Sequence, residues 1–400
     1  MRSGDLPWAS DAPDGQRADR MDMGPDVCFL VGRTASGPFR RVSPGLCPGA
    51  PPEVSIVSPG LQAASLGTFP STHDGTLVDP QGRRLDYLRL AVTDRCNLRC
   101  QYCMPAAGVT LGERDEILSI DELIRVGGIF AGLGVRTFRI TGGEPLVRRG
   151  VVSLIAALRA LPSAPEVLLT TNGLLLADHL DALAEAGLQR VNLSLDSLDP
   201  VTWATITRRD GFERVRAAVD QVLARGLGLK INMVVLPGTN DHELAAFADL
   251  ARERPVTVRF IEPMPFVGEG RLCGPGITGT EILAKLAQSH AIEAEPVVAG
   301  SVEKLFRIDG FLGRIGVIEG HSRTFCGTCR RLRLDARGRM RTCLYGRPSA
   351  FLRPLIRAGA EDRALVAAIR QSVAGRLTDG VASELDHRRH NLDSMVNIGG

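Results

Sequence analysis

The 400-residue sequence has few aromatic residues, little net charge and no long apolar run. Aromatic residues make up 4% of the chain, which leaves few rings for stacking against nucleic-acid bases. A net charge of +3 gives no reason to expect a nucleic acid or a membrane surface as partner. No apolar stretch approaches the ~18–20 residues of a membrane-spanning helix. We therefore expect a soluble enzyme that binds neither nucleic acid nor membrane.

Three of the nine cysteines follow one another with the spacing Cys-x3-Cys-x2-Cys and have no fourth partner nearby. Structural zinc sites and ordinary electron-transfer iron–sulfur clusters use four protein ligands. Three thiolates around a four-iron cluster would leave one iron open to a small molecule. The pattern predicts a reactive cluster whose ligands are Cys96, Cys100 and Cys103.

A second set of cysteines, Cys326, Cys329 and Cys343, also lacks a fourth member. His321 is the nearest residue that could complete a zinc site, so the spacing leaves zinc open as an alternative. Two incomplete sets in one chain favour two clusters, each with an open iron. Because cluster thiolates would form disulfides in an oxidising compartment, we expect a cytoplasmic location. The remaining cysteines are interpreted as ordinary thiols: Cys28, Cys47 and Cys273.

The chain divides by composition and pattern into three parts. Residues 1–75 are rich in Gly and Pro, which is typical of disordered segments, and their aspartates do not fit a transit peptide. We predict a disordered N-terminal extension over residues 1–75 and a barrel domain over residues 76–265. Residues 266–400 are predicted to form a C-terminal domain that carries the second cysteine set and a Gly-Gly tail.

Strand and helix patterns alternate in six units from Asp86 onward, which predicts a parallel α/β sheet with right-handed crossovers. A doubly wound sheet and a barrel fit this alternation equally well. Polar residues at the strand ends favour the barrel, because the C-terminal strand ends of a barrel build one active site. We predict a partial (β/α)6 TIM-type barrel with a C-terminal cluster-binding extension. The expected strands are 86–93, 136–140, 166–171, 190–195, 229–235 and 256–262; the expected helices are 151–161, 176–186, 212–225, 241–252 and one that follows the capping box Ser119–Glu122.

The first cysteine loop, with Tyr102 before its third cysteine, resembles that of the radical S-adenosylmethionine (SAM) enzymes. The resemblance implies a 4Fe-4S cluster whose open iron binds SAM, and a reduction that splits SAM into methionine and a 5'-deoxyadenosyl radical. It also implies SAM contacts from Tyr102, from Gly143 in the motif Thr141-Gly-Gly-Glu-Pro145, and from Ser194 and Met264 at later strand ends. On its own, the Gly-Gly pair is more typical of a tight turn, and a methionine is more typical of packing.

Further motifs extend the resemblance to the molybdenum cofactor biosynthesis protein A family, the GTP 3',8-cyclases. This implies conversion of GTP to (8S)-3',8-cyclo-7,8-dihydroguanosine 5'-triphosphate, the first step of molybdenum cofactor biosynthesis, with guanine held at the second 4Fe-4S cluster. It also implies an external electron donor, a downstream cyclic pyranopterin monophosphate synthase and a homodimer. The matching segments are 93–105, 139–146, 169–173, 191–196, 259–262, 325–334 and the terminal Asn397-Ile-Gly-Gly400.

Cationic residues near both cysteine sets are candidates for binding the triphosphate. Guanidinium groups form charge-assisted, often bidentate contacts with phosphate oxygens. The resemblance implies that the C-terminal Gly399 and Gly400 enter the active site, and we include them with the first cysteine set as catalytic candidates. The candidate substrate-binding residues are Arg89, Arg139, Thr170, Lys230, Arg331, Leu332 and Arg333.

Two other functions remain open at this stage. One is a different radical SAM enzyme with an auxiliary cluster, such as a peptide modifier, although those enzymes usually have more cysteines in the C-terminal segment. The other is a non-catalytic iron–sulfur electron carrier, which explains neither the open coordination positions nor the arginines. The basic run 330–341 lacks the interleaved aromatic residues of a nucleic-acid site.

Overall fold

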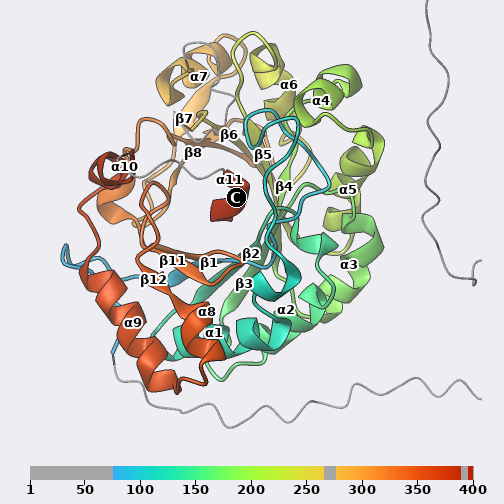
Figure 1. The fold of residues 1–400 in the computed structure, drawn as a ribbon. Helices are drawn as coiled ribbons and strands as arrows, with labels where there is room; N and C mark the ends of the chain where they lie inside the picture. Colours follow the sequence, from blue (N-terminus) through green and yellow to red (C-terminus); the bar gives the residue numbers. More distant parts are fainter. Residues whose placement is uncertain (1–74, 265–275, 389–394, 400) are drawn as a thin grey trace, which may run out of the picture. The chain divides into compact units, whose positions relative to one another are not determined.

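The computed structural model describes residues 75–264, 276–388 and 395–399 (Figure 1). The predicted extension over residues 1–75 lies outside this range, except for its last residue. None of the described helices combines the length and the apolar character that crossing a bilayer requires.

Six parallel strands form the centre of the sheet and lie side by side in chain order. Figure 1 shows helices on the outside of this curved sheet, as expected of consecutive strand–helix units. This arrangement confirms the predicted partial barrel. The strands are β1 (Tyr87–Ala91), β2 (Thr137–Thr141), β3 (Glu166–Thr171), β4 (Arg190–Ser194), β5 (Gly228–Val234) and β6 (Val256–Ile261). The helices are α1 (Ile120–Gly132), α2 (Val151–Arg159), α3 (Leu176–Glu185), α4 (Pro200–Thr207), α5 (Phe212–Ala224) and α6 (Leu244–Asp249), with 3-10 turns η1 (Arg114–Glu116), η2 (Pro145–Val147) and η3 (Asp241–Glu243).

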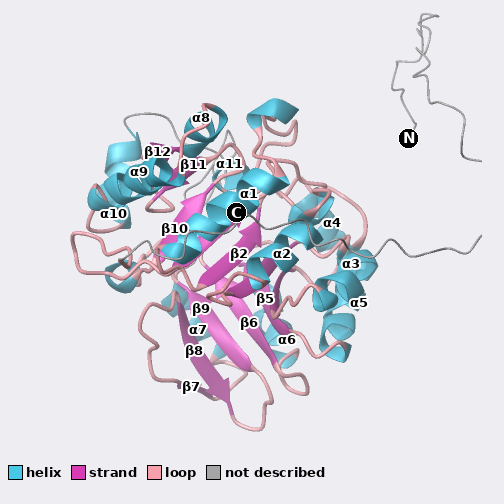
Figure 2. Cartoon of the chain, turned by 90° about the horizontal axis from the view of Figure 1, so that it is seen from below, coloured by secondary structure: helices cyan, strands magenta, loops and turns pink. Residues whose placement is uncertain are grey.

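Strands from the C-terminal third of the chain extend this sheet at both edges, and two of them are parallel to the barrel strands (Figure 2). Strand β10 (Arg331–Leu334) pairs in parallel with β1, and β9 (Arg314–Ile318) pairs in parallel with β6. The outer strands are antiparallel: β7 (Ile292–Ala294) and β8 (Glu303–Ile308) beyond β9, and β11 (Arg339–Arg341) and β12 (Ala350–Phe351) beyond β10. The remaining elements are α7 (Gly279–Leu286), η4 (Cys326–Thr328), α8 (Leu352–Arg357), α9 (Asp362–Ala374), α10 (Gly380–Arg388) and α11 (Met395–Ile398).

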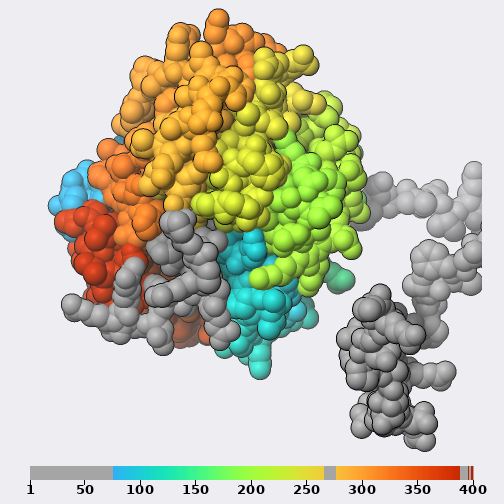
Figure 3. Space-filling model, turned by 90° about the horizontal axis from the view of Figure 1, so that it is seen from above, coloured from blue at the N-terminus to red at the C-terminus, as the bar shows by residue number. Residues whose placement is uncertain are grey.

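The barrel strands present apolar residues to the helices and polar residues to the interior. In β1, Leu88 and Leu90 are fully buried in the hydrophobic core, and Arg89 between them lines the interior cavity. Side chains of a strand alternate between its two faces, so one strand serves both the core and the cavity. In the space-filling view from above, the surface colours follow chain order around the barrel from cyan through green and yellow to orange (Figure 3).

A local sequence signal explains where α1 begins, but not where α6 begins and ends. The capping box predicted before α1 is present: the Ser119 hydroxyl accepts a hydrogen bond from the Glu122 amide at 3.0 Å, and the Glu122 carboxylate accepts one from the Ser119 amide at 2.7 Å. The predicted bounds of the helix at 241–252 are wrong at both ends. Its first residues form the 3-10 turn η3, and α6 ends at Asp249. The carbonyls of Ala251 and Arg252 instead accept hydrogen bonds from the turn before β9, at 2.9 and 3.0 Å.

Candidate active site

One cavity of about 580 Å³ inside the barrel brings together nearly all the candidate residues. It opens among the C-terminal strand ends and the loops that follow them, where barrel enzymes build their active sites. Both cysteine sets contribute to its lining. The sequence-predicted residues that line it are Arg89, Cys96, Cys100, Tyr102, Cys103, Arg139, Gly143, Thr170, Ser194, Lys230, Met264, Cys326, Cys329, Arg331, Arg333 and Cys343.

The first cysteine loop follows β1 and is held by the end of α4, a helix that the sequence analysis missed. The amides of Arg99 and Gln101 donate hydrogen bonds to the carbonyls of Thr207 and Ile206, each at 2.9 Å. The signal that could have revealed α4 is Asp199 followed by a proline. Asp199 caps the helix by accepting a hydrogen bond from the Thr202 amide at 2.7 Å.

Gly143 packs directly against the first cysteine loop. A Cβ at this position would lie 2.3 Å from the carbonyl oxygen of Arg95, which is closer than real Cβ atoms come, and 3.0 Å from the amide nitrogen of Cys96. The neighbouring amides hold the same contact, because Gly143 donates to the Thr93 carbonyl and Glu144 to the Arg95 carbonyl, each at 2.8 Å. Only glycine lets the loop after β2 approach the first cysteine loop this closely. The Gly-Gly motif therefore positions the cysteines, and it also faces the cavity.

Burial makes the thiolate form of two cysteines of the first set unfavourable unless a cation binds them. Burial raises the pKa of Cys100 well above its usual value, and the nearby Asp196, Cys103 and Cys96 raise it further. Burial also raises the pKa of Cys96. Ligation by cationic iron would relieve this penalty. In the described part of the chain, no three Cys, His, Asp or Glu side chains converge closely enough for one metal ion. A 4Fe-4S cluster has no such requirement, because each thiolate binds a different iron.

The second cysteine set faces the same cavity, and two buried arginines that also line the cavity hold its main chain. Arg83 donates to the Cys326 carbonyl at 2.9 Å, and Arg376 donates to the Cys329 carbonyl at 3.0 Å. Burial alone would raise the pKa of the Cys329 thiol, but the charges of Arg331 and Arg376 outweigh it and lower that pKa. His321, the possible zinc ligand, is exposed and does not line the cavity. The three cysteines therefore fit a second cluster rather than a four-ligand zinc site.

Two buried carboxylates beside the first loop were not singled out from the sequence. The Tyr102 hydroxyl donates a hydrogen bond to Asp196 at 2.7 Å, and burial raises the pKa of Asp196 to about 6. Burial also raises the pKa of Glu144 to about 7, although that carboxylate accepts hydrogen bonds from the Asn172 amide at 2.7 Å and the Thr171 hydroxyl at 2.8 Å. Both lie within sequence motifs, Gly-Gly-Glu and Asn-Leu-Ser-Leu-Asp, and this was the signal that could have identified them.

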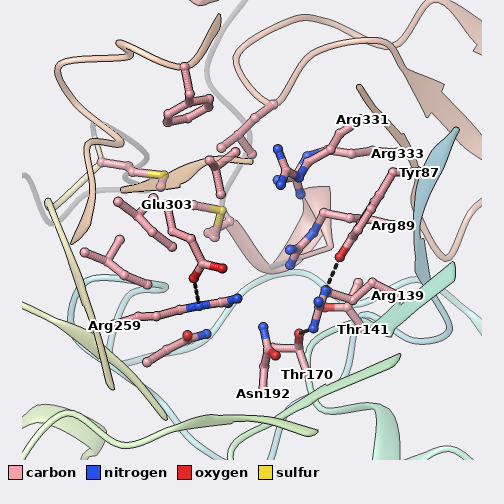
Figure 4. A pocket seen from close by; sticks show the side chains of 18 of the residues that line it. Tyr87, Arg89, Arg139, Thr141, Thr170, Asn192, Arg259, Glu303, Arg331 and Arg333 are labelled. Atoms are coloured by element: carbon pink, nitrogen blue, oxygen red, sulfur yellow. Dashed lines mark hydrogen bonds and ion pairs between the residues drawn. The ribbon is translucent and has the colours of Figure 1, made fainter. Parts of the chain in front are cut away.

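Four arginines gather on one side of the cavity around Tyr87 (Figure 4). The strand register brings them together: Arg89 of β1 pairs with Arg139 of β2 and with Arg333 of β10, and Arg331 pairs with Tyr87. Arg139 donates to the Tyr87 hydroxyl, and the Arg331 guanidinium lies 5.1 Å from the centre of the Tyr87 ring. Burial alone would raise the pKa of Tyr87, but the cations of Arg139, Arg331 and Arg89 outweigh it and lower that pKa. We call Arg89, Arg139, Arg331 and Arg333 the arginine group.

The arginine group is suited to an anion that the described residues do not supply. In the described part of the chain, none of its members forms an ion pair with a carboxylate. Arg89 Nε and Arg331 Nη1 are buried without a hydrogen-bond partner among the described residues. Burial lowers the pKa of Arg89 well below its usual value, and the charge of Arg333 lowers it further. Buried guanidinium nitrogens normally have acceptors, so their absence points to a polyanionic ligand.

A second pair of cations lies across the cavity and has a carboxylate partner. Lys230 of β5 and Arg259 of β6 both form ion pairs with Glu303 of β8. Burial lowers the pKa of Lys230 to about 8, and the charge of Arg259 adds to this effect. Burial also lowers the pKa of Arg259 to about 10. Lys230 was predicted from the sequence to be a site residue, whereas Glu303 was not. We call Lys230, Arg259 and Glu303 the Glu303 triad.

Comparisons with known proteins agree with this geometry. The Radical SAM superfamily model matches residues 90–251, and the Molybdenum Cofactor Synthesis C model matches residues 256–380. A GTP 3',8-cyclase of Geobacter sulfurreducens is 42% identical over 328 residues, covering 81% of this chain and 99% of that protein. A GTP 3',8-cyclase of Heliobacterium modesticaldum is 43% identical over 337 residues, covering 81% of this chain and 100% of that protein. The mitochondrial GTP 3',8-cyclase of Arabidopsis thaliana is 38% identical over 326 residues, covering 81% of this chain and 83% of that protein.

The chain belongs to the GTP 3',8-cyclase family.

The C-terminal tail of this GTP 3',8-cyclase family member reaches the barrel interior (Figure 1). Ile398 is 1% exposed and packs with Tyr345. The carbonyl of Gly399 accepts a hydrogen bond from Arg333 at 3.4 Å. Gly399 has φ +84°, and a Cβ there would lie 2.7 Å from the Cβ of Ala91, so both conformation and space favour glycine. Gly400 lies outside the described residues, and its predicted role remains a prediction.

Leu332 is the candidate whose side chain lies away from the cavity. It is fully buried in the hydrophobic core and lies between Arg331 and Arg333 on β10. Alternation along the strand turns the two arginines inward and Leu332 outward. Any contact between Leu332 and a ligand in the cavity would have to come from its main chain.

Proposed function

We propose that this chain is a radical SAM GTP 3',8-cyclase, a lyase that converts GTP to (8S)-3',8-cyclo-7,8-dihydroguanosine 5'-triphosphate. This is the first step of molybdenum cofactor biosynthesis. One observation carries the proposal: two three-cysteine sets line the same cavity as an arginine group that has no carboxylate partner among the described residues. An electron carrier has no use for a polyphosphate site between its clusters.

The cofactors fit the residues that line the cavity. When bound, the first cluster and SAM supply the radical that starts the reaction, and the second cluster supplies an open iron for the guanine. Tyr102, Gly143, Ser194 and Met264 are proposed to contact SAM, which is supported by their position in the lining of the cavity. The cluster ligands are Cys96, Cys100 and Cys103 for the first cluster, and Cys326, Cys329 and Cys343 for the second.

The protein's own task is to orient GTP between these two centres. We propose that the arginine group binds the triphosphate, with Lys230 and the hydroxyl of Thr170 completing the contacts. Arg139 already donates a hydrogen bond to Thr170 at 3.4 Å, so a ligand held by one would reach the other. Each charge-assisted contact contributes about 1.5–3 kcal/mol, enough for several to hold a flexible nucleotide in one orientation.

The Gly399-Gly400 tail is proposed to complete the active site. Support comes from the hydrogen bond between Arg333 and the Gly399 carbonyl, which couples the tail to the arginine group. Extending the chain with a few residues after Gly400 should abolish cyclisation and leave the iron content of both clusters unchanged. Retained turnover in such an extended protein would contradict a role for the tail.

Several partners are inferred from the reaction and the resemblance. Splitting SAM consumes an electron that neither SAM nor GTP provides, so we infer an external electron donor. Thiolate-bound clusters require reducing conditions, which favours the cytoplasm. A homodimer and a downstream cyclic pyranopterin monophosphate synthase are inferred from the resemblance alone. We also infer that the barrel domain ends near residue 265, shortly after β6 ends at Ile261.

The test is an anaerobic assay of the reconstituted full chain with SAM, a reductant and GTP. We expect both 5'-deoxyadenosine and the cyclised nucleotide, with neither formed by Cys96→Ala. Cys326→Ala should retain the first cluster and lose the cyclised nucleotide. Cys273→Ala is the matched control, because its thiol belongs to neither set, and it should retain about eight irons and full turnover.

Other outcomes would separate the alternatives. SAM cleavage without any response to GTP would keep the radical chemistry and refute the substrate. No SAM cleavage from protein with intact iron would favour an electron carrier. Zinc bound at either cysteine set would refute the two-cluster proposal.

A further inference from the structure

Glu303 is a carboxylate that lies among the cations on one side of the cavity. Its side chain is only 9% exposed, and it forms an ion pair with Lys230. It also forms an ion pair with Arg259, which Figure 4 shows. Nothing in the arrangement of the first or second cysteine set requires a carboxylate at this place. A fixed negative charge here repels the phosphates that the surrounding cations attract.

The fold places Glu303 there by reaching across the sheet. The strand order is β5-β6-β9-β8, so Glu303 on β8 contacts Arg259 two strands away and Lys230 three strands away. Gly316 on β9 pairs in register with Arg259 and lies beneath this contact. A Cβ at Gly316 would lie 3.2 Å from Arg259 Cγ and 3.4 Å from Glu303 Oε2, so a larger residue there would crowd the ion pair.

Glu303 is charged in the empty cavity. Burial alone would raise its pKa, but the charges of Arg259 and Lys230 outweigh burial and lower the pKa. Without the carboxylate, two partly buried cations would face each other unpaired, which is unfavourable in a site shielded from water. Glu303 therefore stabilises Lys230 and Arg259 while no ligand is present.

We propose that Glu303 is an internal competitor of the substrate, which sets the affinity of the cavity for polyphosphates. In the empty protein it occupies Lys230 and Arg259, and a bound triphosphate must displace it from at least one of them. This inference rests on the proposed function, since it assumes that a nucleoside triphosphate is the ligand. The arginine group needs no such displacement, because no described carboxylate occupies it.

A different role for Glu303 predicts the opposite result. Its carboxylate could accept hydrogen bonds from the base or the ribose of the nucleotide, in which case it would assist binding. A neutral replacement of the same shape separates the two roles. Glu303→Gln removes the charge and keeps the size and much of the hydrogen-bonding capacity.

The experiment measures equilibrium binding of GTP, inorganic tripolyphosphate and guanosine to the reconstituted, SAM-loaded full chain under anaerobic conditions. Glu303→Gln should bind GTP and tripolyphosphate about tenfold more tightly than the wild type, because two cations are released from competition. Guanosine binding should stay within about twofold, because it carries no phosphate. Weaker or unchanged binding of GTP by Glu303→Gln would overturn the proposal.

Controls separate a change in affinity from a change in folding. Iron content should match the wild type. The melting temperature of the nucleotide-free Glu303→Gln protein should fall, and GTP should raise it by more than in the wild type; a smaller rise would count against the proposal. Glu303→Asp, which keeps the charge, should bind GTP closer to the wild type than Glu303→Gln does.

The matched control is Glu293→Gln. Glu293 of β7 forms an ion pair with Arg307 of β8 at 2.6 Å, but both side chains are exposed and neither lines the cavity. This substitution removes an equivalent charge from the neighbouring strand and should leave all three affinities unchanged. If the wild type binds neither GTP nor tripolyphosphate, the proposed function fails. If it binds them with the same affinity as Glu303→Gln, only this inference fails.

Discussion

The cavity has two cationic sides that differ in one respect, the presence of a carboxylate. The arginine group on β1, β2 and β10 has no ion-pair partner among the described residues, whereas Lys230 and Arg259 on β5 and β6 share Glu303. Burying a charge without a partner is unfavourable, and a ligand that supplies the opposite charge recovers that free energy on binding. The arginine group is thus ready to bind an anion but lowers the stability of the ligand-free protein. Lys230 and Arg259 are stabilised by Glu303, which lowers their affinity for an anion.

The largest expected effect is the loss of an arginine from the side without a carboxylate. Arg331→Ala should weaken GTP binding by about 10- to 100-fold, because it removes a charge-assisted contact worth about 1.5–3 kcal/mol. The affinity of Arg331→Lys for GTP should lie between those of Arg331→Ala and the wild type, because lysine keeps the charge and lacks the planar guanidinium. Equilibrium binding measures this, with iron content as the check on the adjacent cluster.

Arg307→Ala is the control for this substitution, because Arg307 is an exposed arginine outside the cavity. It should bind GTP like the wild type. Equal losses in Arg331→Ala and Arg307→Ala would indicate a general charge effect and refute a specific contact.

Removing an arginine should change the free energy of unfolding of the nucleotide-free protein in opposite directions on the two sides of the cavity. Arg89→Met should raise the free energy of unfolding by about 1–3 kcal/mol, because it removes a buried charge that has no carboxylate partner. Arg259→Met should lower it by a similar amount, because Glu303 then keeps only Lys230. Denaturant titration of the nucleotide-free protein checks both, and a change of the same sign in both variants would contradict the comparison.

The pH dependence should come from Lys230. With its pKa near 8, Lys230 loses its charge as the pH rises from about 7 to about 8.5, and GTP binding should weaken a few-fold. A guanidinium introduced at position 230 would keep its charge over this range, so Lys230→Arg should make binding independent of pH there. Unchanged pH dependence in Lys230→Arg would assign the titration to another group.

The same pKa shift has a consequence for stability. The folded protein releases the Lys230 proton near pH 8, whereas an unfolded chain holds it until about pH 10.4, so the unfolded state binds more protons in between. The contribution of Lys230 to stability should therefore rise with pH across this window. Lys230→Met should remove that rise in denaturant titrations of the nucleotide-free protein.

The smallest expected effect concerns Tyr87, which organises the arginine group. Tyr87→Phe removes the acceptor of Arg139 and keeps the ring beneath Arg331, so GTP binding should weaken only about two- to fourfold. Tyr87→Ala should weaken it more, because it also removes the ring. If both variants behaved alike, the ring would have no role in placing Arg331.

Local patterns predicted much of the barrel and of the chemistry. Period-two and helical spacing located all six central strands, and the capping box located the start of α1. Cysteine spacing identified six side chains that line one cavity. Weak local patterns were missed or misjudged: α4 has little amphipathic character, and the end of α6 depends on hydrogen bonds to a turn before β9.

The sequence by itself determined the chemical types present: two sets of three thiols, the glycines that allow close approach, and cations alternating with core residues along strands. These follow from spacing within one segment. Only the tertiary structure decided which charges would meet. Glu303 on β8 reaches Arg259 two strands away and Lys230 three strands away. Arg331 of β10 comes beside Tyr87 of β1 through a pairing of distant segments. Electrostatic interaction depends on distance and burial rather than on position along the chain, so the asymmetry of the cavity exists only in the folded protein.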